Sequence, residues 1–113
     1  MKGESVMFAR IVEFIPKAEK KEELIKAVRN EVVPVLKKQP GFLEILPFLP
    51  ESTTEKTIIV SLWAEKRDAE RYEREAYPKV AEIVKPYLTT AITFKQYVVE
   101  TSVSPNFMES FVA

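Results

Sequence analysis

The sequence predicts an α+β fold of the ferredoxin-like type, a four-stranded antiparallel sheet built in the order β-α-β-β-α-β. Apolar stretches with the two-residue period of strands alternate with stretches that carry the helical period. A polar segment, residues 50–56, joins the two middle strands as a hairpin. The 113 residues suffice for one core. We therefore expect one domain over residues 1–101, followed by an apolar tail over residues 102–113.

The first strand is expected at Val6–Ile15, where Pro16 closes it because proline cannot donate to a sheet ladder. The first helix is expected at Lys17–Lys38, with an apolar stripe of residues four apart: Leu24, Val28, Val32 and Leu36. Pro34 removes a helical hydrogen bond, so we expect it to kink or break this helix unless the last turn is irregular. Pro40-Gly41 then ends it.

The two middle strands are expected at Phe42–Leu49 and Thr57–Trp63. Pro47 favours an edge position for the first of them. The second has apolar residues on both faces. One face carries Ile58, Val60 and Leu62, and the other carries Thr57, Ile59, Ser61 and Trp63.

The second half of the chain repeats the helix-then-strand order. A charged helix is expected at Lys66–Glu75, with Ala69 and Tyr72 facing inward. Pro78 suits the first turn of a further helical piece, which Pro86 ends. Its apolar stripe comprises Val80, Ile83, Val84 and Tyr87. The last strand is expected at residues 89–101, which are rich in Thr, Ile, Phe, Tyr and Val.

A sheet that is apolar on both faces needs two covers. Helices cover one face, and we expect a second copy of the chain to cover the other, which gives a homodimeric α/β barrel. The face toward the partner is predicted to carry residues such as Phe42, Ile59, Trp63, Tyr97 and Val99. Left in water, such an apolar patch would exceed what soluble monomers usually expose, so we expect the partner to cover it. The turn that Ser104-Pro105 begins is expected to pack on the domain or on the partner, or to cover a cavity.

Composition excludes several function classes. The 17 basic residues cancel the 17 acidic residues, so no net charge favours nucleic acid or a membrane surface. The chain has no Cys and no His, which removes thiolate chemistry, imidazole chemistry and the usual metal ligands. The N-terminus lacks the apolar run of a signal peptide. We expect a cytoplasmic protein that uses neither a metal nor a bound cofactor.

The strand ending in Trp63, followed by a charged helix with inward Ala69 and Tyr72, has a familiar pattern. With the helix end NEVVPVLKKQPGF, it resembles the antibiotic biosynthesis monooxygenase-like family of dimeric α/β barrels. The resemblance spans about Val6 to Thr101. It implies a small homodimer with a pocket between helices and sheet in each subunit. Members of that family include cofactor-independent oxygenases of anthrones or quinols and haem-degrading enzymes.

Haem degradation is not expected here. The family's haem degraders use Asn, Trp and His, and this chain offers Arg10 or Ile11, Tyr72, and Ala81 or Glu82 at about those places. The resemblance to the anthrone-type oxygenases carries over at Trp63. Where those enzymes have a polar Asn, this chain has Ile59 or Val60.

The candidate catalytic residues are Trp63, Arg10 and Tyr72, and the candidate pocket residues are Ser61, Tyr77, Tyr97 and Glu44. Trp63 could stack on a flat aromatic substrate or fill core space. Arg10 could pair with Glu44, or it could stabilise a deprotonated substrate oxygen. Two functions follow as hypotheses. One is a cofactor-independent monooxygenase of a small aromatic or quinol-type compound, and the other is a non-catalytic homodimeric protein that binds a small ligand or serves as an interaction partner.

Overall fold

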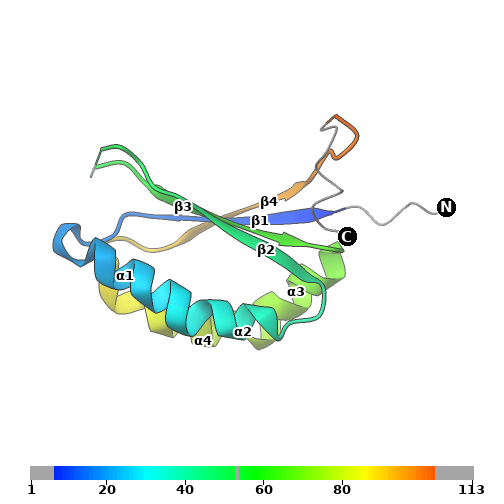
Figure 1. Ribbon diagram of the computed structural model, residues 1–113, viewed down its shortest axis with the longest axis horizontal. Coiled ribbons are helices and arrows are strands. Elements are labelled where there is room, and N and C mark those ends of the chain that lie inside the picture. The colour runs from blue at the N-terminus through cyan, green and yellow to red at the C-terminus, as the bar shows by residue number, and fades with distance from the viewer. Residues whose placement is uncertain (1–6, 53, 104–113) are drawn as a thin grey trace.

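The described residues fold into a four-stranded antiparallel sheet with their helices on one face (Figure 1). This computed structural model describes residues 7–52 and 54–103. The strands, in the spatial order β2-β3-β1-β4, are β1 (Phe8–Phe14), β2 (Phe42–Phe48), β3 (Thr57–Trp63) and β4 (Thr93–Val98). The predicted ferredoxin-like order is confirmed, and β2 is an edge strand as Pro47 indicated.

The helices follow the predicted positions. They are α1 (Lys21–Ala27), α2 (Val33–Lys37), α3 (Lys66–Glu75) and α4 (Tyr77–Val84), with single turns of 3-10 helix at Ala18–Lys20 and Lys85–Tyr87. Ala69 and Tyr72 of α3 are buried, as predicted from their spacing. Among residues 7–52 and 54–103, no helix is long and apolar enough to cross a membrane.

The first helical segment does not break at Pro34. A π-helical turn, Val28–Val32, lies directly before α2, and the N–H of Val33 donates to the carbonyl oxygen of Val28. Pro34 then occupies the first turn of α2, where its missing N–H costs little. The irregular turn therefore takes the place of a break.

The core lies between the sheet and the helices. Its buried members include Phe8 and Phe14 of β1, Trp63 of β3, Leu36 of α2 and Tyr72 of α3. None of the helices in the described part of the chain lies over the opposite face of the sheet (Figure 1). A smaller buried cluster lies there, formed by Met7, Ala9 and Leu62.

The prediction of which residues face away from the helices was only partly right. Tyr97 and Val99 do lie on the open face, opposite or beside the cluster of Met7 and Ala9. Phe42, Ile59 and Trp63 instead pack in the core under the helices. Because both faces of β3 are apolar, the two-residue period could not tell which face the helices cover.

A tight turn joins α2 to β2. Gly41 has a φ of +81°, a backbone conformation that residues with a side chain rarely adopt. A Cβ at this position would collide with the carboxylate of Asp68. The N–H of Ala64 donates to the carbonyl oxygen of Gly41 at 2.8 Å. The start of β2 and the start of α3 are thus fixed together by one residue without a side chain.

The last strand is shorter than predicted. Residues 89–92 lie outside β4, because Thr89 turns both its N–H and its hydroxyl to the carbonyl oxygen of Ile15, each at 2.8 Å. The tail that begins at Ser104-Pro105 falls outside the described residues. Its packing and the domain boundary at residue 101 stay predictions.

Candidate functional site

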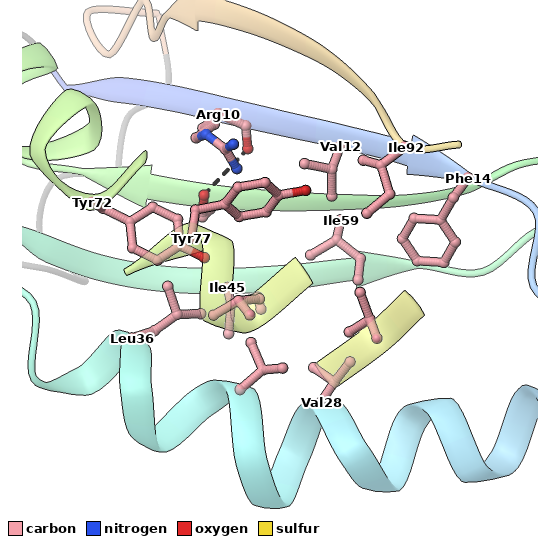
Figure 2. Close-up of a pocket in the computed structure, with 14 residues that line it drawn as sticks. Arg10, Val12, Phe14, Val28, Leu36, Ile45, Ile59, Tyr72, Tyr77 and Ile92 are labelled. Atoms are coloured by element: carbon pink, nitrogen blue, oxygen red, sulfur yellow. Dashed lines mark hydrogen bonds between the residues drawn. The ribbon is translucent and has the colours of Figure 1, made fainter. Parts of the chain in front are cut away.

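A small cavity lies between the sheet and the helices (Figure 2). Its free volume is about 50 Å³, room for a few water molecules. Most of the wall is apolar, and includes Val12, Phe14, Val28, Val32, Leu36, Ile45, Ile59, Val80, Val84 and Ile92. The polar side chains gather at one end, where Arg10, Tyr72 and Tyr77 meet (Figure 2), and Ser61 lies opposite Arg10 on the neighbouring strand. The structure thus brings together four of the seven predicted site residues.

Arg10, on the central strand β1, is buried, with 3% of its side chain exposed. Its guanidinium carbon lies 4.3 Å from the ring centre of Tyr77, 4.7 Å from that of Phe94 and 5.5 Å from that of Tyr72. Its Nε is 3.7 Å from a carboxylate oxygen of Glu73. Nε and one terminal nitrogen have no hydrogen-bond partner among the described residues. A buried cation with spare donors is costly unless a ligand completes it.

Tyr72 and Tyr77 keep their protons at neutral pH. Burial raises the pKa of both phenols, and the positive charge of Arg10 opposes this rise only in part. Each hydroxyl is therefore available as a neutral hydrogen-bond donor.

Trp63 supports the cavity wall from behind and does not line the cavity. Its indole is 0% exposed, stacks on Tyr72 with ring centres 5.0 Å apart, and meets the edge of Phe42. Its N–H donates to the hydroxyl of Ser61 at 3.0 Å, and this hydroxyl donates to the carbonyl oxygen of Arg10 at 3.3 Å. Of the two readings of Trp63, the structure favours the core residue, because the indole is fully buried and does not line the cavity.

Glu44 and Tyr97 lie away from the cavity, contrary to their prediction as pocket residues. Tyr97 of β4 is opposite Ala9 on the open face and is 51% exposed. Glu44 is exposed on β2 opposite Leu62, with its carboxylate accepting the N–H of Ile45 at 3.0 Å. A shift of register between Phe42 and Glu44 turns Glu44 to the open face. The considered ion pair of Arg10 with Glu44 is therefore not formed.

Three contributors to the site were missed by the sequence reasoning. Glu73 of α3 faces Arg10 with one carboxylate oxygen. The same oxygen accepts a hydrogen bond from the side-chain amide of Gln96 at 3.4 Å. Phe94 packs its ring on the edge of Tyr77 at 5.4 Å. Ile92 lines the cavity from the segment before β4. The register of β4 against β1, which places Phe94 beside Val12, could have indicated Phe94. Glu73 on α3 and Ile92 before β4 left no such signal, because their places depend on tertiary packing.

The cavity adjoins an outer cleft between α4 and the segment before β4. The lining of that cleft includes Glu82, Lys85 and Thr89, and Tyr77 and Ile92 belong to both spaces. These two side chains therefore separate the cavity from the cleft. Within the described part of the chain, no group of three or more His, Cys, Asp or Glu side chains could hold a metal ion.

The sequence model described as antibiotic biosynthesis monooxygenase matches residues 7–82. The chain belongs to this family. The match includes Arg10, Ser61, Tyr72 and Tyr77, and it ends before Ile92 and Phe94. Membership of this family supports a monooxygenase-like role, at the level of the family only. A search of curated proteins gave no match.

Solved structures show that the family fold is shared at low sequence identity. A Nitrosomonas europaea protein, itself named only as a candidate antibiotic biosynthesis monooxygenase, has a TM-score of 0.70 at 16% identity, over 88% of this chain and 96% of its own. SnoaB, a cofactor-independent oxygenase from Streptomyces nogalater, has a TM-score of 0.68 at 9% identity, over 84% and 94%. A conserved Methanosarcina mazei protein has a TM-score of 0.68 at 13% identity, over 82% and 92%. These likenesses concern the fold.

Proposed function

We propose that this protein is a cofactor-independent monooxygenase of a small, flat aromatic or quinol-type compound, which it binds as an anion. The observation that carries the proposal is the buried guanidinium of Arg10, which has spare N–H groups and lines the apolar cavity together with Tyr72 and Tyr77. Because the free volume is about 50 Å³, an aromatic ring enters only when Tyr77 and Ile92, which separate the cavity from the outer cleft, move apart. Membership of the family and the fold shared with a cofactor-independent oxygenase support it.

In the proposed reaction, the substrate itself supplies the electrons that reduce dioxygen. Loss of one proton gives an enolate or phenolate, whose oxygen pairs with Arg10 and whose charge the fixed cation stabilises. The electron-rich carbon reacts with dioxygen to form a hydroperoxide. Cleavage of its O–O bond leaves one oxygen atom on carbon, and the other departs as water. At a CH₂ centre, CH₂ and O₂ give C=O and H₂O, so no external reductant is consumed.

Oxygen uptake with a panel of anthrones and hydroquinones tests this proposal. We expect uptake by the wild-type protein and a loss of about 100-fold in kcat/KM for Arg10→Met, the size typical of losing one donor to a developing oxyanion. Arg10→Met should stay folded, because an apolar side chain of similar length replaces a poorly paired buried charge. Arg67→Met, at a side chain that is 76% exposed, is the control. Wild-type turnover by Arg10→Met would reject the proposal.

A second candidate is a non-catalytic protein that binds the same kind of anion. It is favoured by one observation: no carboxylate is among the described residues that line the cavity, and Glu73 reaches Arg10 from a side chain that is 42% exposed. Tight, Arg10-dependent binding without oxygen uptake across the panel would support this candidate.

We also propose that a second copy of the chain covers the open face of the sheet. Large apolar side chains are exposed on that face, and they include Leu46 at 40%, Phe48 at 55% and Tyr97 at 51%. Their number is more than an isolated soluble domain usually leaves in water. Location in the cytoplasm stays a prediction.

A further inference from the structure

A second cavity lies beside the first, between the first helical segment and the β2–β3 hairpin. Its free volume is about 200 Å³. It is lined by α1, the π-helical turn, the start of α2, and both strands, and its wall is apolar except for Arg29 and Thr57. It lies on the side of the core away from the outer cleft, and neither the proposed reaction nor the packing of the sheet requires it.

The two cavities share a wall. Val28 of the π-helical turn, Ile45 of β2 and Ile59 of β3 line both of them. Figure 2 shows these three side chains, from three different elements, around the same space. Three aliphatic side chains therefore form the shared wall, and changes of side-chain rotamer are common when ligands bind.

The second cavity ends at a buried polar group without a partner. Thr57 is 2% exposed, and its hydroxyl has no hydrogen-bond partner among the described residues. Thr57 and Ser61 are four residues apart on one face of β3, which corresponds to roughly 13 Å. Between Thr57 at one end and Arg10, beside Ser61, at the other, the shared wall is apolar. Two buried groups with unused hydrogen bonds thus stand at the far ends of two adjoining apolar cavities.

We infer that the two cavities together bind one elongated ligand. Its anionic aromatic head pairs with Arg10, an apolar extension passes the shared wall, and a hydrogen-bonding group at its far end reaches Thr57. The ligand class is therefore a phenol or quinol that carries an aliphatic extension with a terminal polar group. The inference rests on the proposed function for its head group only.

Binding without dioxygen separates this inference from turnover. The probes are 2-alkylhydroquinones with methyl, butyl, hexyl and octyl chains, and affinity is measured by calorimetry under nitrogen. We expect the affinity of the wild-type protein to rise roughly threefold for each methylene that enters the second cavity. Val33→Phe fills that cavity from α2 and should abolish the rise, and Ile25→Phe should do the same from α1.

Val35→Phe is the matched control. Val35 is also a partly buried residue of α2 that packs on the core, but it lines neither cavity. This variant should keep the dependence on chain length. An affinity that does not change with chain length in the wild-type protein, or that still rises in both filled variants after circular dichroism has shown them folded, would overturn the inference.

The far end has its own test. A hexyl probe with a terminal hydroxyl is compared with the plain hexyl probe, in the wild-type protein and in Thr57→Val. We expect the affinity ratio of the two probes to shift by about tenfold against the hydroxylated probe in the variant, because its hydroxyl is then buried unpaired. Equal ratios would overturn the assignment of Thr57.

The outcomes also separate this inference from the proposed function. Chain-length dependence without oxygen uptake would reject the monooxygenase and keep the elongated ligand. Oxygen uptake with hydroquinones at affinities independent of chain length would keep the monooxygenase and reject the elongated ligand.

Discussion

At the scale of single residues, Arg10 is held by ring faces more than by a carboxylate. Three aromatic rings lie within 5.5 Å of its guanidinium carbon, whereas the nearest oxygen of Glu73 is at 3.7 Å from Nε on a side chain that is 42% exposed. Ring faces attract a cation without using its N–H groups. The donors of Arg10 therefore stay available to an anion that enters the cavity.

The buried Tyr72 beside Arg10 leads us to expect that the free energy of unfolding falls at alkaline pH. Burial raises the pKa of Tyr72 above its ordinary value of 10.0, so above pH 10 the folded chain keeps a proton that the unfolded chain has lost. The contribution is complete below pH 10 and falls as the pH rises, by up to about 1.4 kcal/mol per pH unit. Tyr72→Phe should make this decline less steep.

Urea unfolding at several pH values between neutral and strongly alkaline measures the effect. Tyr87→Phe, at a partly buried ring outside the cavity, is the control substitution. If Tyr72→Phe and the wild-type protein lost stability at the same rate above pH 10, the raised pKa would be refuted.

At the scale of elements, the sequence predicted most boundaries because local chemistry sets them. The limits of β3 and α3 agree with the prediction, and Pro78 lies in the first turn of α4, which begins one residue earlier than expected, at Tyr77. The effect of Pro34 could not be predicted from the sequence. A proline that breaks a helix and one that follows a π-helical turn give the same sequence pattern. The register shift that turns Glu44 outward left no mark at all, because it depends on pairing with β3.

The turn before β2 gives a prediction at this scale. Gly41→Ala should lower the free energy of unfolding by about 2 to 3 kcal/mol, because it places a side chain at positive φ and against Asp68. Thermal or urea unfolding measures the change. Gly41→Ala combined with Asp68→Ala should recover only the part that comes from the carboxylate, because the Cβ of residue 68 stays 2.6 Å from the new side chain. A stability equal to that of the wild-type protein would contradict the geometry of this turn.

At the scale of the whole molecule, the candidate site was predictable only in part. The sequence supplied Arg10, Ser61, Tyr72 and Tyr77 as polar residues of the sheet and helices. It could not supply the layer in which Trp63 lies, since the same alternation fits a core under helices and an interface between subunits. Only tertiary packing, which puts Tyr72 on the indole, decides between them.

The open face gives a prediction for assembly. We expect light scattering at micromolar concentration to give twice the chain mass of 13.0 kDa for the wild-type protein. Leu46→Glu places a charge on the open face, within the proposed interface, and should reduce the mass to that of one chain. Val98→Glu, at an exposed side chain of β4 opposite Phe8 on the helix side, should stay dimeric. A wild-type mass of one chain would exclude the dimer.

The position of Trp63 has a practical consequence. It is the one tryptophan of the chain, it is shielded from solvent, and its ring rests on Tyr72, which forms part of the cavity wall. Its fluorescence should be that of an indole in apolar surroundings, and an occupant that displaces Tyr72 should change the intensity or colour of the emitted light. The protein thus carries its own optical reporter of occupancy, free of any attached dye.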